Sequence, residues 1–313
     1  MWEMEDRSVQ TELAGVFTDD PLAKLPVGTS LPLEPVVWGG SDATIIPQGA
    51  INWTFFEGAL LSVVISTVEE QVVVGTAVVV APGLAVTATH LFDKQLSEIL
   101  QGTATLTCMG PTSAGMELWR VRKLSSCKGD DLAYMSIELA SSILPGWRFR
   151  SIAVTTRAPR PGESVSLVGF HFPRMTREGS NTIRAYGNLY AAAGEVACVH
   201  HPIRDRFLMP YPVIEVDCGS LGGMSGGAVL DRQGYLLGVT SRGLETEDGK
   251  GPSNCAWIIG GLNRQIEIPW PPGLYQQPIH ILQIDQRAMR IEGRDRIRAI
   301  NEHTTQYQVW SDR

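Results

Sequence analysis

Short apolar runs and turn-forming residues alternate along most of this chain, from Phe55 to about residue 262. Twelve runs stand out: ALLSVVIS (59–66), QVVVGTAVVV (71–80), LAVTA (84–88), ATLTC (104–108), ELWRVRKL (117–124), LAYMSIEL (132–139), ESVSLVGF (163–170), TIRAYGNLY (182–190), VIEVD (213–217), GAVL (227–230), YLLGVTS (235–241) and CAWIIG (255–260). Gly, Pro, Asn or Asp residues separate them. Runs of this length and spacing are typical of a β-sandwich or a β-barrel. Longer segments with the 3.6-residue period of amphipathic helices are missing from this region, so we expect an all-β fold.

The two flanking segments have a different pattern. The N-terminal residues are polar, acidic and proline-bearing, as in TDDPLAKLPVGTSLPLEP, and we expect an arm that is partly disordered or packed along a neighbouring surface. Near the C-terminus, the prolines of IEIPWPPGLYQQP interrupt any regular element. The chain therefore divides into an acidic arm (1–53), one large domain (54–265) and a short C-terminal extension (266–313).

The C-terminal extension is expected to contain one strand and one helix. Ile284, Ala288 and Ile291 would form the apolar stripe of that helix. Arginines alternate with acids here, which favours a solvated helix face over a docking surface.

The composition is that of an ordinary globular protein. Of the 313 residues, 43% are hydrophobic and 19% are charged, enough to bury a sizeable core. The net charge is −7, and residues 1–53 hold eight acids against two bases, so the rest of the chain is close to neutral. A large domain with nearly balanced charge does not favour nucleic acid as a partner.

The N-terminal stretch MWEMEDRSVQTEL lacks the basic start and apolar core of a secretory signal, and no apolar run is long enough for a membrane span. We therefore expect a soluble, cytoplasmic protein without membrane contact.

Cysteines and histidines give no sign of a metal site. The five cysteines form no CxxC pair, and their odd number fits reduced thiols, although a disulfide between Cys218 and Cys255 stays open as an alternative. His200 and His201 have no cysteine or carboxylate at zinc-like spacing. We predict neither a metal ion nor an organic cofactor.

The stretch GGMSGGAVL (222–230) surrounds one serine, Ser225, with glycines. A serine hydroxyl becomes a nucleophile when a base takes its proton, a third group orients that base, and donors bind the developing oxyanion. Glycines allow backbone N–H groups to turn toward one point and a substrate to come close. The N–H groups of Gly223 and Ser225 are the expected donors. Taken alone, the stretch also fits a tight hairpin turn.

A histidine and an acid lie at strand ends where a base and its orienting group are expected. His90 follows the apolar run in GTAVVVAPGLAVTATH, and Asp131 directly precedes the run LAYMSIEL. A carboxylate at such a strand entry can be buried against an imidazole, where it fixes the tautomer and stabilises the imidazolium. Each residue alone would fit an ordinary turn. Together, in the order His, Asp, Ser, they predict a catalytic triad.

The blocks VTATH, DDLAYM and GGMSGGAV resemble the signature blocks of trypsin-like serine proteases, the chymotrypsin-fold superfamily that includes the HtrA proteases. PGESVSLVGFHFP resembles the strand that opens the second barrel in bacterial members. IEVDCGSLGGMSGGAVLDRQGYLLGVTSRG resembles the serine loop followed by the wall of the specificity pocket. The resemblance covers roughly residues 55–262 and implies two six-stranded antiparallel β-barrels with a boundary near 145–160. In this family the acid directly precedes an apolar-Ala pair, which assigns Asp131 and leaves Asp130 as the alternative.

The sequence departs from the secreted members of this family. Met224 stands where they carry an aspartate that pairs with a newly cut N-terminus, so activation by that kind of trimming is not expected. Leu91 stands beside His90 where they carry a cysteine. Both departures indicate an intracellular, bacterial-type member. The residues after 265 are too few for a PDZ domain, so we expect the HtrA likeness to end with the protease core.

Alignment on the serine also implies a substrate pocket. Its base would be formed by Gly219 and Ser220, and its wall by Ser241, Arg242 and Gly243. No acid stands at the base, so the Lys/Arg preference of trypsin is not implied. We expect small or medium apolar residues before the scissile bond, while Arg242 leaves an acidic preference open.

The resemblance therefore implies a serine endopeptidase that acts on a protein or peptide substrate through an acyl-enzyme. Relatives of this kind often cleave one dedicated protein, so the resemblance also suggests a single protein substrate. A catalytically latent or inactive module that binds peptides or scaffolds a complex is the alternative, and the presence of all three triad residue types argues against it. The helices and the Ser, Asp, His order of α/β-hydrolase esterases are not seen. A regulatory partner could bind the N-terminal arm or the C-terminal extension.

Overall fold

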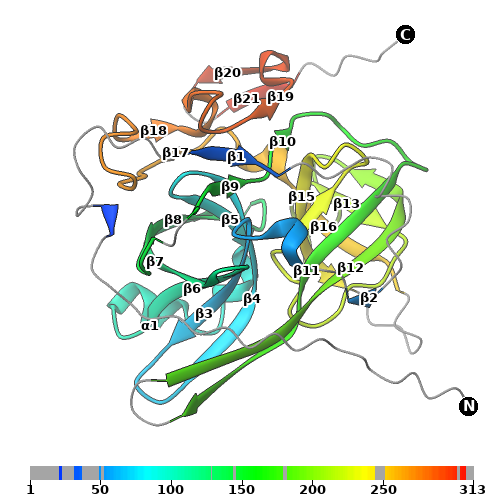
Figure 1. Cartoon of the computed structure of the whole chain (residues 1–313). Coiled ribbons are helices and arrows are strands. Elements are labelled where there is room, and N and C mark those ends of the chain that lie inside the picture. Colours follow the sequence, from blue (N-terminus) through cyan, green and yellow to red (C-terminus); the bar gives the residue numbers. More distant parts are fainter. Residues whose placement is uncertain are drawn as a thin grey trace, which may run out of the picture.

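The computed structural model describes residues 21–22, 32–36, 49–50, 53–127, 129–143, 146–178, 182–243, 251–301 and 304–307. Its strands form two closed barrels that lie side by side (Figure 1). The predicted double barrel with six strands in each ring is confirmed. In the described part of the chain, the only α-helix is α1 (Leu96–Gln101), and no helix is long and apolar enough to cross a lipid bilayer.

The first barrel closes in the order β3-β4-β5-β8-β7-β6, with antiparallel neighbours. Its strands are β3 (Leu60–Ser66), β4 (Gln71–Ala81), β5 (Leu84–Ala88), β6 (Thr105–Thr112), β7 (Gly115–Cys127) and β8 (Leu132–Leu139). Both faces of several strands are buried: Ala77 and Val79 pack inside this barrel, while Val78 and Val80 pack toward the second. Successive side chains of a strand point to opposite faces, so a run such as AVVV supplies the interior of one barrel and the seam between the two.

The second barrel closes in the order β14-β11-β12-β13-β16-β15, because β14 also pairs with β15. Its strands are β11 (Ser164–Glu178), β12 (Thr182–His200), β13 (Val213–Val216), β14 (Ala228–Leu230), β15 (Leu236–Gly243) and β16 (Ser253–Trp257). β11 and β12 are longer than their apolar runs predicted, and Figure 1 shows their hairpin, in green, extending well beyond the barrel. β9 (Phe149–Ser151) and β10 (Val154–Thr155) lie in the connection between the barrels.

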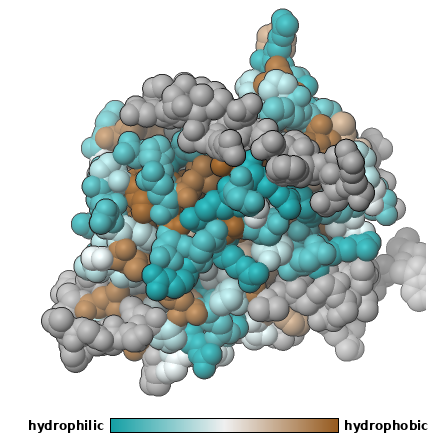
Figure 2. All heavy atoms as spheres, turned by 90° about the horizontal axis from the view of Figure 1, so that it is seen from above, coloured by the Kyte–Doolittle hydropathy of each residue, from teal (hydrophilic) through white to brown (hydrophobic). Residues whose placement is uncertain are grey.

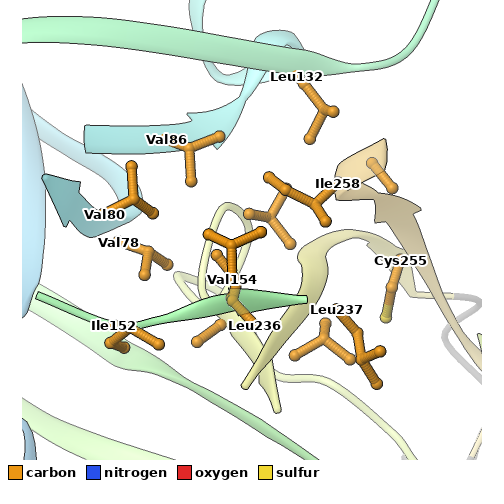
Figure 3. Packing of buried hydrophobic residues seen from close by; sticks show 14 of the residues in the cluster. Val78, Val80, Val86, Leu132, Ile152, Val154, Leu236, Leu237, Cys255 and Ile258 are labelled. Atoms are coloured by element: carbon orange, nitrogen blue, oxygen red, sulfur yellow. The ribbon is translucent and has the colours of Figure 1, made fainter. Parts of the chain in front are cut away.

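One continuous core spans the seam. Val78, Val80 and Val86 of the first barrel, Val154 of the connection and Leu236 of the second barrel belong to the same cluster of buried side chains. Figure 3 shows these side chains pointing toward one another. Close packing of this kind holds the two barrels in a defined relative position, which matters because residues from both barrels meet at the site described below.

The described pieces of the N-terminal arm touch both barrels. β1 (Leu33–Pro35) pairs in parallel with β9, and β2 (Gly49–Ala50) pairs with β12. A 3-10 turn, η2 (Trp53–Phe56), leads into β3. These parts of the arm are packed along a neighbouring surface, which was one of the two predicted states.

The helix predicted for the C-terminal extension is wrong. The turn η4 (Ile258–Gly261) and the strand β17 (Gln265–Ile266) lead into the extension, whose described residues form short strands and 3-10 turns: β18 (Ile279–His280), η5 (Ile281–Gln283), β19 (Ile291–Glu292), η6 (Arg294–Arg296), β20 (Ile297–Asn301) and β21 (Thr304–Tyr307). Ile284, Ala288 and Ile291 are buried, but against the second barrel's core rather than along a helix. Pairing of Ile291 with Val154 of β10 replaces helical hydrogen bonds, and Gly293 turns the chain at φ +69°.

The face of the molecule on the side of this extension is largely hydrophilic. Figure 2 shows that face with apolar residues in small patches among polar ones. Most apolar side chains of the extension, among them Ile281, Ile284 and Met289, are buried, as expected for a segment that packs on its own domain, although Leu274 is exposed.

The cysteines with described side chains, Cys108, Cys198, Cys218 and Cys255, are free thiols. The disulfide between Cys218 and Cys255 that the sequence left open is not formed.

Candidate active site

Strand pairing in the first barrel brings His90 and Asp131 together. β5 ends at Ala88 and leads into the 3-10 turn η3 (Thr89–Phe92), which contains His90, while Asp131 directly precedes β8. β5 and β8 are antiparallel neighbours with Ala88 opposite Leu132. The end of one strand therefore lies beside the start of the other. This pairing brings together two side chains that are 41 positions apart in the sequence.

Two contacts join His90 to Asp131. His90 Nδ1 lies 3.0 Å from Asp131 Oδ2, and the backbone N–H of His90 donates to Oδ1 at 3.0 Å. An ionised carboxylate only accepts hydrogen bonds, so Nδ1 carries the proton and Nε2 is left as the basic nitrogen. Asp131 has φ +48°, a left-handed conformation that is uncommon for residues other than glycine. A strained backbone of this kind is frequent at functional sites.

Two hydroxyl groups from the second barrel also reach Asp131. Ser241 Oγ donates to Oδ2, and the hydroxyl of Tyr211 lies 2.9 Å from Ser241 Oγ and 3.4 Å from Oδ2. Burial alone would raise the pKa of Asp131, but the hydrogen bonds from His90 and Ser241 outweigh burial and hold the pKa below its usual value. Asp131 is therefore ionised at neutral pH, as an imidazolium partner requires.

Asp130 has different neighbours. Its carboxylate binds the guanidinium of Arg264 and accepts the backbone N–H of Leu132 at 3.0 Å. Burial raises the pKa of Asp130, and Arg264 opposes the increase. Asp131 contacts His90, while Asp130 ties the C-terminal part of the chain to the start of β8.

Ser225 comes from the second barrel, in the turn before β14. Its hydroxyl donates to the backbone oxygen of Ser241 at 3.3 Å, and among the described residues this is its one hydrogen bond. The structure thus joins His90 to Asp131 and brings Ser225 to Ser241, and no hydrogen bond between Ser225 and His90 occurs among the described residues. In proteins without substrate, contacts between a nucleophile and its base are often long or poorly aligned.

The backbone around Ser225 leaves two N–H groups unused. Within the described ranges, the N–H groups of Gly223 and Ser225 donate to no protein acceptor. By contrast, the N–H of Met224 donates to Leu221 O at 3.1 Å, and that of Gly227 to Met224 O at 2.8 Å. These bonds close a compact turn from which the two free N–H groups are available to a ligand oxygen.

The crowding around Gly226 explains why glycine follows Ser225. A Cβ atom on Gly226 would stand 2.1 Å from Thr76 O and 2.1 Å from Thr87 Oγ1. Gly226 also has φ +80°, which other residues adopt only with strain. On the opposite strand, a Cβ on Gly75 would stand 2.6 Å from Ser225 O. Backbone from the first barrel therefore approaches the serine turn as closely as glycine allows.

Met224 fills a buried place in the same turn. It is fully buried, and its sulfur accepts the N–H of Leu221 at 3.3 Å. A thioether and backbone hydrogen bonds support this turn without an ion pair at this position.

Of the predicted pocket residues, Ser241 contacts Ser225 through its backbone oxygen, and Ser220 lies close to Gly243. Gly219 and Ser220 are half-buried, Ser241 is buried, and Arg242 and Gly243 are exposed. The two sides approach closely, because Ser220 Oγ lies 2.9 Å from where a Cβ on Gly243 would stand. Behind them, Ser253 Oγ donates to Cys218 O at 2.7 Å.

Residues 75–239, more than half of the chain, match the family of trypsin-like peptidase domains. The chain belongs to this family. The matched segment runs from Gly75 to Val239 and so contains His90, Asp131 and Ser225.

Several solved structures show a more distant similarity. An inactive mutant of Rv3671c from M. tuberculosis H37Rv is 18% identical, with a TM-score of 0.41 over 64% of this chain and 82% of that one. The HtrA-type protease AlgW with a tripeptide is 20% identical, with a TM-score of 0.45 over 71% of this chain and 64% of that one. The MamO protease domain from Magnetospirillum magneticum is 15% identical, with a TM-score of 0.43 over 64% and 92%. No curated protein sequence matches this chain, and its membership rests on the domain match.

Three features of this trypsin-like peptidase were missed in the sequence. Tyr211 supports the acid, Ser241 contributes its hydroxyl to the acid as well as its backbone to the pocket, and Thr76 contacts the serine turn. Tyr211 lies between two prolines and Thr76 lies inside an apolar run. The only signal in the sequence that could have identified them as part of the site is that each is a polar residue. No group of three His, Cys, Asp or Glu side chains suited to a metal ion occurs among the described residues.

Proposed function

We propose that this trypsin-like peptidase is a serine endopeptidase that cleaves protein or peptide substrates through an acyl-enzyme. Ser225 is the nucleophile, His90 the general base and then the general acid, and Asp131 the group that orients His90. The observation that carries the proposal is the 3.0 Å contact between His90 Nδ1 and Asp131 Oδ2, since it leaves Nε2 as the basic nitrogen that can accept the proton of the serine.

The reaction starts with a rotation of the Ser225 hydroxyl from Ser241 O toward His90 Nε2. As Oγ attacks the peptide carbonyl carbon, its proton passes to Nε2, and the carbonyl oxygen becomes an oxyanion bound by the N–H groups of Gly223 and Ser225. His90 then gives the proton to the leaving amine, and the C–N bond breaks. Water repeats these steps on the acyl-enzyme, which releases the acid product and restores Ser225.

A fluorophosphonate tests the proposed nucleophile. Ser225 Oγ should attack phosphorus and displace fluoride, and intact mass should show one adduct on the wild type and none on Ser225→Ala. Ser97→Ala is the matched control, because Ser97 is an exposed serine in α1 whose hydroxyl contacts only Glu98. We expect this variant to react like the wild type.

An unreactive wild type with a normal circular dichroism spectrum would contradict the proposal. It would favour the latent or peptide-binding module, to which the resting direction of the Ser225 hydroxyl gives some support. An adduct that persists in Ser225→Ala would also contradict it, since another side chain would then be the nucleophile.

The narrow gap between Ser220 and Gly243 supports a preference for a small, uncharged residue before the scissile bond. No acid stands at Gly219 to bind Lys or Arg. A peptide library should therefore show Ala, Ser or Val at this position. Ser220→Gly should admit larger side chains such as Leu and increase their kcat/KM about 10-fold relative to Ala, the usual effect of one or two methylene groups in a pocket. A profile dominated by Lys or Arg, or unchanged by Ser220→Gly, would contradict this assignment.

A further inference from the structure

Thr76, in the middle of β4, links the first barrel to the serine turn of the second. Its side chain is fully buried. The Thr76 N–H donates to Ser225 O at 2.8 Å, and its hydroxyl donates to Gly223 O at 3.0 Å. Both carbonyl groups belong to the residues whose N–H groups are the proposed oxyanion donors.

The direction of the Thr76 hydroxyl proton follows from its neighbours. The backbone N–H of Phe170 donates to Thr76 Oγ1 at 2.9 Å, so this oxygen is the acceptor in that bond. The only proton of the hydroxyl is then free to go to Gly223 O, which has no proton of its own. The Thr76 carbonyl accepts the hydroxyl proton of Thr87 at 2.6 Å, so the backbone of Thr76 is itself held in place.

The serine turn needs such support because glycines give it little of its own. Gly223 has φ +93° and Gly226 has φ +80°, in a region where glycine moves freely. A peptide group is planar, so a held carbonyl oxygen fixes the N–H of the following residue. The two carbonyls that Thr76 holds therefore fix the peptides 223–224 and 225–226, which lie on either side of the peptide that carries the Ser225 N–H and next to the one that carries the Gly223 N–H. His171 Nδ1, at 3.2 Å from Gly222 O, holds a third carbonyl of the turn. The carbonyl of Met224 is held within the turn by the N–H of Gly227, so Thr76 holds two of the four carbonyls of residues 222–225.

We propose that Thr76 is a positioning residue for the oxyanion site: its hydroxyl and N–H hold the carbonyls of Gly223 and Ser225, and thereby aim the N–H groups of these two residues at the reacting carbonyl oxygen. This inference rests on the proposed function. It assigns to a residue of the first barrel a role in stabilising charge on a substrate held by the second.

Thr76→Val tests the proposal, since valine keeps the branched shape and the backbone N–H but lacks the hydroxyl. We expect kcat on a peptide substrate to fall about 10- to 100-fold with KM within about twofold, somewhat less than the loss of a whole oxyanion donor. Thr76→Ser restores the hydroxyl and should return kcat to within a few-fold of the wild type. Thr240→Val is the matched control: Thr240 is equally buried, and its hydroxyl has no partner among the described residues, so kcat should not change.

A second measurement separates positioning from folding, because Thr76→Val also leaves the N–H of Phe170 without its acceptor. A peptide aldehyde ending in alaninal adds to Ser225 Oγ and forms a hemiacetal whose oxygen occupies the oxyanion site, whereas the matching peptide alcohol, ending in alaninol, has no carbonyl group and forms no adduct. In Thr76→Val the aldehyde should lose affinity by about the same factor as kcat/KM, while the peptide alcohol binds unchanged. A variant with a lowered Tm but wild-type kcat and aldehyde affinity would overturn the proposal.

The two proposals fail in different ways. If the wild type forms the fluorophosphonate adduct and Thr76→Val forms it equally fast, only the role of Thr76 is refuted. If the wild type is as unreactive as Ser225→Ala, the peptidase function and the role of Thr76 are both refuted.

Discussion

Replacing Asp131 by asparagine should lower kcat on a peptide substrate about 10⁴-fold, the loss known for this exchange in the Ser-His-Asp template of the family. Asparagine has nearly the same shape, and with its oxygen in the place of Oδ1 it can still accept the hydrogen bond from the His90 backbone, while its NH2 group takes the place of Oδ2. Its amide would face Nδ1 as a donor, which would force the proton of His90 onto Nε2. The histidine would then be unable to take the proton of Ser225. The rate of peptide hydrolysis and the rate of fluorophosphonate labelling measure this loss.

Asp130→Asn is the matched control, since the two acids are adjacent and equally buried. This change removes the ion pair with Arg264, whose guanidinium is largely buried. We expect a loss of folding stability on the order of 3 kcal/mol, as for other broken buried pairs, and a labelling rate within a few-fold of the wild type. A loss of reactivity in Asp130→Asn with little change in Asp131→Asn would reverse the roles assigned to the two acids.

Replacing Gly226 by alanine should both destabilise the fold and abolish rapid labelling of Ser225. The new Cβ would stand 2.1 Å from Thr76 O and from Thr87 Oγ1, so backbone must move. This crowding and the strain of φ +80° should together lower the free energy of unfolding by about 3 kcal/mol or more. The serine would be displaced, and a shift on the order of 1 Å costs about 10²-fold in rate. Urea unfolding and fluorophosphonate labelling measure the two effects.

Gly102→Ala separates strain from crowding. Gly102 has φ +73°, but a Cβ there would meet no atom within 4 Å. We expect a cost of about 1 kcal/mol from the backbone conformation alone and unchanged labelling. If Gly226→Ala has the same small loss of stability and the same labelling rate as Gly102→Ala, the close approach of the two barrels at Ser225 is not required for reactivity.

Local patterns in the sequence were sufficient to predict the strands, an all-β fold and the strand ends that carry the candidate triad, and the resemblance to the family added the double barrel. Burial alternates with a period of two along a strand, so the apolar runs report strands wherever they lie. His90 and Asp131 each adjoin such a run, and their chemistry is visible without knowing what pairs with what. The family blocks then supplied the order of the barrels and the expected pocket.

The pattern failed where long-range pairing decides the conformation. Ile284, Ala288 and Ile291 have helical spacing, yet pairing with β10 and burial on the second barrel hold this segment in strands and turns. The hairpin of β11 and β12 also continues past its apolar runs, because backbone pairing between two strands does not require buried side chains.

By itself, the sequence determined which residues form strands and which polar residues stand at their ends, because these properties depend on neighbours only a few positions away. Only the tertiary structure decided which polar groups meet. Asp131 receives Ser241 from 110 positions away, and the serine turn receives Thr76 from 147 positions away. Such contacts arise from the packing of one barrel against the other, and a residue buried in an apolar run carries no local mark of the partner that it will meet.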